Sequence, residues 1–132
     1  MYKKVHTYTD YNGTERTETF YFNLSKAEAM EMELTKEGTM SEWMQKVLDT
    51  NNVPEIIRLF KEIVLKSYGE KSPDGRRFIK NDEIREAFSQ TEAYSDIFME
   101  LATDAKAAAD FVNGILPKEI SQNVEDHPAL EG

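Results

Sequence analysis

The chain has 132 residues, of which 39% are apolar and 31% are charged, and it contains no cysteine. This composition is typical of a folded, soluble protein, and it excludes both a disulfide framework and a metal site built on thiolates. The sequence has no run of about 18 apolar residues that would span a membrane. Its first residues lack the apolar region of a secretory signal. We therefore expect a cytoplasmic protein.

The net charge of −9 is concentrated in the second part of the chain. Residues 1–80 contain 13 basic and 13 acidic side chains, whereas residues 81–132 contain 3 basic and 12 acidic ones. Nucleic-acid binding needs a basic face that neutralises phosphates, so this distribution argues against a nucleic-acid partner. The small basic cluster is either a solvated loop or a docking point for the acidic half of a neighbouring copy. Its members are Lys71, Arg76, Arg77 and Lys80.

Asn12-Gly13 separates two alternating runs, residues 3–11 and 14–22. An Asn-Gly pair supplies the two positive φ angles of a type I′ turn, so the pattern predicts a β-hairpin. A two-residue turn would pair Tyr8 with Thr17. The side chains then predicted to face the core are Val5, Phe20 and Phe22, and those on the opposite face are Tyr2, Tyr8 and Tyr21.

The outer edges of this two-stranded ribbon have unpaired backbone groups that can accept a strand from a partner. Alternatively, charged side chains keep the edges soluble; these are Lys3, Lys4, Glu15 and Arg16. An isolated hairpin is only marginally stable in water. We therefore expect the hairpin to lie on a helical body, to gain a strand from another chain, or both.

The rest of the chain reads as helices, each preceded by a residue suited to an N-cap. These caps are Ser25, Thr39, Asn52, Asn81, Thr91 and either Thr103 or Asp104. The first of these helices is expected to extend to about residue 36, the second to end before Asn51-Asn52, the third to cover residues 54–68, and the last to end at Gly114 and Pro117. In the first helix, the spacing predicts that Ala27, Met30 and Leu34 face inward and that Met32 is exposed. The segment 72–75, Ser-Pro-Asp-Gly, predicts a mobile turn.

These elements predict a single domain over residues 1–117 with an α+β fold that is mostly α. It begins with an N-terminal two-stranded antiparallel β-hairpin, followed by a bundle of about five to six helices. Residues 118–132 are polar and non-periodic, which predicts a disordered acidic C-terminal tail.

The sequence contains no recognisable catalytic motif, so we expect no enzyme, no cofactor and no metal. The two histidines, His6 and His127, have no third ligand at a spacing suited to zinc. Phosphate-binding glycine loops and nucleophile elbows are absent. Binding to another protein is the remaining class of function.

Methionines and an arginine pair are the candidate contact residues for a protein partner. Methionine is flexible and recurs on surfaces that accept varied partners, although it also fills ordinary cores. Four methionines and the single tryptophan lie close together in the sequence, so they predict an adaptable groove for an apolar helix of a partner. The candidate partner-binding residues are Met30, Met32, Met40, Trp43, Met44, Arg76 and Arg77.

Several whole segments resemble the tail assembly chaperones of long-tailed bacteriophages and of prophages of Gram-positive bacteria. The resemblance covers roughly residues 3–117. It is carried by the segments 8–13 (YTDYNG), 20–28 (FYFNLSKAE), 63–69 (IVLKSYG), 74–80 (DGRRFIK), 88–96 (FSQTEAYSD) and 111–114 (FVNG).

The resemblance implies a chaperone that binds and solubilises the long, apolar tape measure protein and helps to recruit tail tube subunits. It implies the major tail protein as a further partner, a location in the host bacterial cytoplasm, and absence from the mature virion. Family members are often made in short and frameshift-extended forms, and this chain looks like the short form.

Charge adds a further expectation. The neutral first part and the acidic second part would let copies self-associate head to tail, as oligomers on the client.

Two alternatives remain open at this point. The protein is either a structural or adaptor protein that stays in the phage tail, or a small acidic inhibitor of a host protein.

Overall fold

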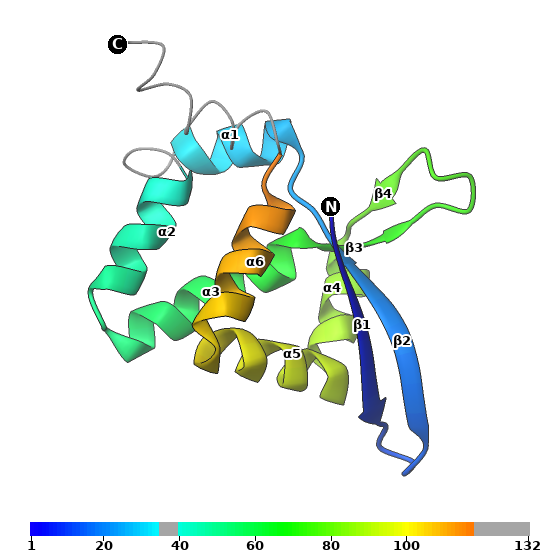
Figure 1. Cartoon of the computed structure of the whole chain (residues 1–132). Coiled ribbons are helices and arrows are strands. Elements are labelled where there is room, and N and C mark those ends of the chain that lie inside the picture. Colours follow the sequence, from blue (N-terminus) through cyan, green and yellow to red (C-terminus); the bar gives the residue numbers. More distant parts are fainter. Residues whose placement is uncertain (35–39, 118–132) are drawn as a thin grey trace.

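The computed structural model describes residues 1–34 and 40–117 (Figure 1). At positions 33, 34, 40, 41, 43, 44 and 48 it describes the backbone alone. The predicted α+β, mostly α fold is confirmed: an N-terminal antiparallel hairpin precedes six helices in the described ranges. The predicted tail, 118–132, lies outside the described residues.

The elements are β1 (Tyr2–Thr9), β2 (Glu15–Phe22), α1 (Lys26–Leu34), α2 (Met40–Asp49), α3 (Val53–Ser67), β3 (Tyr68–Lys71), β4 (Phe78–Ile79), α4 (Asp82–Ser89), α5 (Glu92–Thr103) and α6 (Ala105–Ile115).

The hairpin forms, but its register differs from the predicted one by one residue: Tyr8 pairs with Arg16. The cause is Asp10, whose carboxylate accepts hydrogen bonds from the backbone N–H groups of Asn12 and Thr14, both at 2.9 Å. The Asp10 N–H donates to the Thr14 carbonyl, so the loop has three residues and only its glycine has a positive φ, 82°. A type I turn followed by a left-handed glycine gives such a loop. The predicted type I′ turn was therefore wrong.

This shift reverses the faces of β1, because neighbouring residues in a strand point to opposite sides. Val5 was predicted to face the core but is 57% exposed. Tyr2 and Tyr8, predicted for the outer face, lie on the helix side together with the buried Phe20 and Phe22. The prediction was thus right for β2 and wrong for β1.

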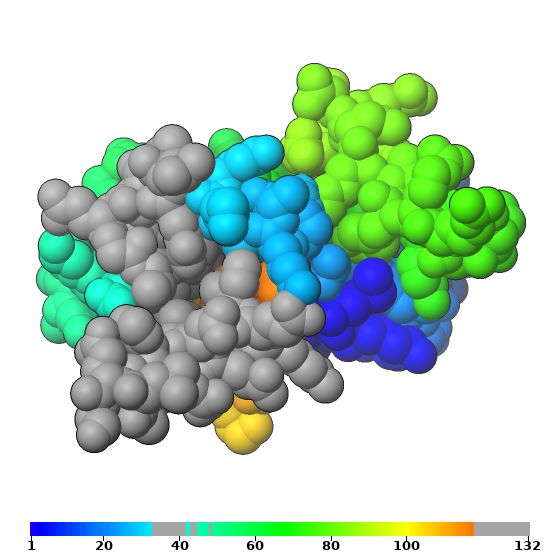
Figure 2. All heavy atoms as spheres, turned by 90° about the horizontal axis from the view of Figure 1, so that it is seen from above, coloured from blue at the N-terminus to red at the C-terminus, as the bar shows by residue number. Residues whose placement is uncertain are grey.

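The sheet has four strands in the order β1-β2-β3-β4, whereas the sequence predicted two. Strand β3 pairs with the end of β2 through Tyr21↔Gly69 and Phe22↔Tyr68 only. Gly69 is required where β3 meets β4, because a Cβ there would lie 2.7 Å from the ring of Phe78 and 2.9 Å from the Ile79 carbonyl oxygen. Seen from above, segment 68–80 forms one end of the molecule (Figure 2).

Aromatic rings join the sheet to the helices. Phe22 has no exposed surface and makes edge-to-face contacts with Tyr2, Tyr68, Phe88 and Phe111, at centroid distances of 5.3 to 6.3 Å. Such contacts add to the free energy gained by burying the rings. Phe22 is therefore the centre of the core, where the hairpin, β3, α4 and α6 meet.

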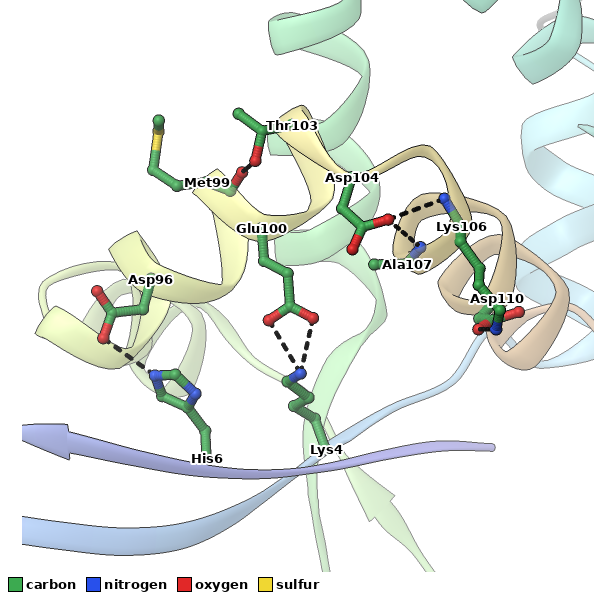
Figure 3. Close-up of polar contacts among 10 residues, drawn as sticks. All are labelled: Lys4, His6, Asp96, Met99, Glu100, Thr103, Asp104, Lys106, Ala107 and Asp110. Carbon is green, nitrogen blue, oxygen red and sulfur yellow. Dashed lines mark hydrogen bonds and ion pairs between the residues drawn. The ribbon is translucent and has the colours of Figure 1, made fainter.

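An ion pair and a side-chain hydrogen bond hold β1 against α5 (Figure 3). Lys4 Nζ lies 2.9 Å from Glu100 Oε1, and His6 Nε2 lies 3.0 Å from Asp96 Oδ2. Lys4 is thus an internal contact of the fold, which corrects the suggestion that it keeps a sheet edge soluble. The hairpin therefore lies on the helical body, which was one of the two arrangements expected from the sequence.

Helix α1 buries other residues than those predicted at Ala27 and Met30, whereas the side chain of Leu34, the third residue predicted to face inward, lies outside the described residues. Ala29 and Met32 are buried, whereas Ala27 is exposed and Met30 is 61% exposed. The two faces are similarly apolar, so a contact distant in sequence decides between them. Lys80 Nζ donates to both carboxylate oxygens of Glu28 at 2.8 Å and to the Asn23 carbonyl at 2.6 Å.

The helix starts agree with the predicted caps where the structure describes them. Side chains of Asn52, Asn81, Thr91 and Asp104 accept hydrogen bonds from backbone N–H groups of the first helical turn. Ser25 and Glu28 form the predicted reciprocal pair. None of the described helices is both long enough and apolar enough to cross a bilayer.

Candidate protein-binding surfaces

Two hollows on the described surface have the size and lining of protein-binding sites. Among residues 1–34 and 40–117, no group of three or more His, Cys, Asp or Glu side chains is arranged to hold a metal ion. Grooves between elements and open backbone edges are surfaces on which one protein binds another.

The first hollow, here called the helical groove, has a volume of about 560 Å³ and lies among α2, α3, α5 and α6. None of its described lining residues is charged, in a chain of which 31% is charged. They are Gln45, Ile56, Phe60, Leu101, Ala102, Thr103, Ala105, Ala108, Ala109, Val112 and Asn113. An apolar groove between helices is suited to the apolar face of another helix.

Small side chains of α6 create this hollow. Ala105, Ala108 and Ala109 line one wall, and each leaves the space that a longer side chain would fill. Phe60 and Leu101 are buried beneath them and give the groove an apolar floor. Asp104 fixes where α6 begins, since its carboxylate accepts from the N–H groups of Lys106 and Ala107 (Figure 3).

The second hollow, here called the β2–α4 groove, has a volume of about 770 Å³. Its floor is aromatic: Tyr68 stacks on Phe88 at a centroid distance of 3.9 Å, and Phe20 lies 5.6 Å from Phe88. Ile84 and Ala87 of α4 form the opposite wall. In contrast to the helical groove, its lining includes the charged residues Glu18, Glu70, Glu83 and Lys71.

Two phenol groups in the β2–α4 groove, those of Tyr8 and Tyr68, keep their protons at physiological pH because the pKa of each is raised. Burial, followed by the nearby carboxylates of Glu70 and Glu18, raises the pKa of Tyr68 to about 12. The pKa of Tyr8 is also raised, chiefly by the hydrogen bond that its hydroxyl donates to Glu18. These two phenols therefore add no negative charge to that of the carboxylates of Glu18, Glu70 and Glu83.

The structure separates the residues that the sequence grouped as one partner site. Met32 is 5% exposed and contacts the core, so the prediction that it is exposed was wrong. Met30 lies on the opposite, exposed face of α1. The side chains of Met40, Trp43 and Met44 lie outside the described residues.

The basic cluster is also divided. Lys80 is committed to Glu28, and Lys71 lies over the ring of Tyr21, 4.5 Å from its centroid. Arg76 and Arg77 are exposed in the loop between β3 and β4. The buried Ser72 organises that loop, because its hydroxyl donates to Asp74 and accepts from the N–H of Arg77.

Neither groove was found from the sequence. The alanine-rich start of α6, residues 105–109, was a usable signal, since clustered alanines on one helix leave room for a partner. The β2–α4 groove had no comparable signal, because β3 and α4 meet β2 only in the folded chain.

A protein-family model described as "Phage tail assembly chaperone" matches the chain over residues 1–131. No curated protein matches the chain, and no solved structure matches it.

Proposed function

We propose that this chain, which belongs to the phage tail assembly chaperone family, binds the tape measure protein of its phage and keeps it soluble until tail tube subunits are recruited. It acts by binding, without catalysis, in the cytoplasm of the host bacterium, and it leaves before the virion is complete. The major tail protein is its second partner, and copies of the chain associate with one another on the client.

The family match over residues 1–131 is the observation that carries this proposal. The helical groove supplies a surface suited to it. A tape measure protein is long, helical and apolar, and its apolar stripes aggregate in water if they stay uncovered. An uncharged groove between helices can bury such a stripe without leaving an unpaired charge in the contact.

Charge supports the same role. A client coated with copies that each carry a net charge of −9 is kept dispersed by mutual repulsion. The exposed Met30, Arg76 and Arg77 are proposed as further contacts with partners or neighbouring copies. Met40, Trp43 and Met44 stay in the proposal as candidate contacts from α2.

The test is co-expression of the chain with a fragment of the tape measure protein, followed by measurement of the soluble fragment and of its dissociation constant. Ala109→Glu places a carboxylate on the exposed wall of the helical groove. Burying that charge against an apolar helix should weaken binding about tenfold or more and return the fragment to the insoluble fraction.

The matched control is Ala27→Glu, the same change at an exposed alanine of another helix, α1, outside both grooves. It should leave binding of the fragment unchanged. Equal binding by the parent chain and both variants would refute the groove as the client site. A client that stays insoluble with the parent chain would refute the chaperone role, and detection of the chain in purified virions would refute its departure before completion.

A further inference from the structure

The backbone of β2 is open along most of one edge. Strand β3 pairs with β2 at Tyr21 and Phe22 and then diverges, so no described strand lies beside residues 15–20 on that side. The Asp10 N–H bonds to Thr14, and the Asn23 N–H bonds to the Ser67 carbonyl on the β3 side. In an antiparallel ladder, bonded pairs alternate. The N–H and C=O groups of Glu15, Thr17 and Thr19 therefore point to the open edge.

This edge lacks two of the devices that block strand addition, proline and lysine, although Glu15, Arg16 and Glu18 are charged. Its outward-bonding positions carry two β-branched threonines, and residues 15–20 contain neither proline nor lysine. The even-numbered residues of β2 point to the helix side, where Glu18 and Phe20 line the β2–α4 groove. A strand added here would send every second side chain into that groove.

The lining of the β2–α4 groove indicates which side chains an added strand would need. Beside Phe20 the lining is apolar, with Phe88, Ile84 and Ala87. Beside Glu18 and Glu83 it is acidic. In the described ranges, no basic side chain lies within 4.0 Å of Glu18, Glu70 or Glu83, whereas the single lysine of the lining is engaged with the Tyr21 ring.

We propose that the open edge of β2 and the adjoining β2–α4 groove bind an extended, basic segment of a partner protein as an added β-strand. The segment carries lysine or arginine opposite Glu18 and an apolar side chain two residues away, opposite Phe20. Main-chain hydrogen bonds to Thr17 and Thr19 fix the register of the added strand. The carboxylates of the groove favour a segment with a positively charged side chain. This site is separate from the helical groove and does not depend on the client proposed for it.

The probe is an end-blocked, fluorescently labelled peptide, Thr-Lys-Thr-Val-Thr-Lys-Thr-Val-Thr, which offers this pattern in either strand direction. Its binding to the full chain is followed by fluorescence anisotropy, and its position is located by amide shifts and hydrogen exchange in nuclear magnetic resonance. Slowed exchange is expected at Glu15, Thr17 and Thr19. A peptide with glutamate in place of lysine should bind at least about fivefold more weakly.

Two variants of the protein carry the same charge reversal on opposite faces of β2. Glu18→Lys reverses a charge on the groove side and should weaken binding about fivefold. Glu15→Lys makes the same change on the outer face of β2 and should weaken binding less than about twofold. Ala109→Glu, in the helical groove, should leave peptide affinity unchanged, which distinguishes failure of this proposal from failure of the client site.

Three results would overturn the proposal: no binding of the lysine peptide at millimolar concentration, equal affinity for Glu18→Lys and the parent chain, or amide shifts confined to α3 and α6. Circular dichroism of each variant shows that its fold is retained, so that a loss of affinity reports the contact itself.

Discussion

The helical groove and the β2–α4 groove are of similar size but differ in what they present to a partner. Helices satisfy their own backbone hydrogen bonds, so the first groove offers side chains alone; these are mostly apolar, with Gln45, Thr103 and Asn113 as uncharged polar members. The second offers open backbone groups along β2, together with three carboxylates. The first is suited to varied apolar helices, whereas the second requires an extended chain, a register and a positive charge.

The largest change in stability is expected from removal of the ring that forms the floor of the β2–α4 groove. Phe88→Ala deletes a side chain that is 3% exposed and contacts Phe20, Phe22 and Tyr68, so it should lower the free energy of unfolding by about 3–5 kcal/mol. Urea denaturation measures the change. Tyr11→Ala, at a side chain that is 75% exposed, should change stability by less than about 0.5 kcal/mol.

A smaller effect is expected from Gly69→Ala at the junction of β3 and β4. The new methyl group would lie within 3 Å of both the Phe78 ring and the Ile79 carbonyl oxygen, so the strands must separate. We expect a loss of about 1–3 kcal/mol by urea denaturation. Amide shifts should spread over β3 and β4 and leave α6 unchanged. Shifts of equal size in α6 would show that the two grooves are mechanically coupled.

Alkaline pH should affect the β2–α4 groove selectively. The folded pKa of Tyr68 is about 12, above its ordinary value of 10, so the folded state holds the phenol proton more tightly than the unfolded state. Stability should therefore decrease as the pH rises from about 10 towards 12, by about 1 kcal/mol after allowance for partial exposure. Urea denaturation at pH 9 and pH 11 measures this. In Tyr68→Phe the decrease should be smaller, and an unchanged decrease would assign it to other groups.

The smallest expected effect is that of salt on affinity. Raising sodium chloride from 50 to 500 mM should weaken the lysine peptide about threefold, because exposed charges are screened. The affinity of the tape measure fragment for the helical groove should change less than that of the peptide. Parallel titrations at both salt concentrations measure the contrast, and an identical salt dependence would mean that both ligands use the same kind of contact.

The N-cap residues in the sequence were enough to predict where the helices begin. The caps at Asn52, Asn81, Thr91 and Asp104 bond to backbone groups within three residues, so their effect is visible in a short stretch of sequence. The hairpin was also recognisable, but its register was not. The Asx contact of Asp10, just before the Asn-Gly pair, competes with the type I′ turn and changes the loop by one residue.

The sequence by itself determined that a β-hairpin precedes about five to six helices and where the capped helices begin, because those features depend on hydrogen bonds between residues close in the chain. Only the tertiary structure decided which face of α1 is buried, that β3 joins the sheet, and that two unlike grooves form. These depend on contacts such as Glu28 with Lys80 and Tyr21 with Gly69. Such contacts form only when distant segments fold together, since their energy comes from packing and from burying paired groups.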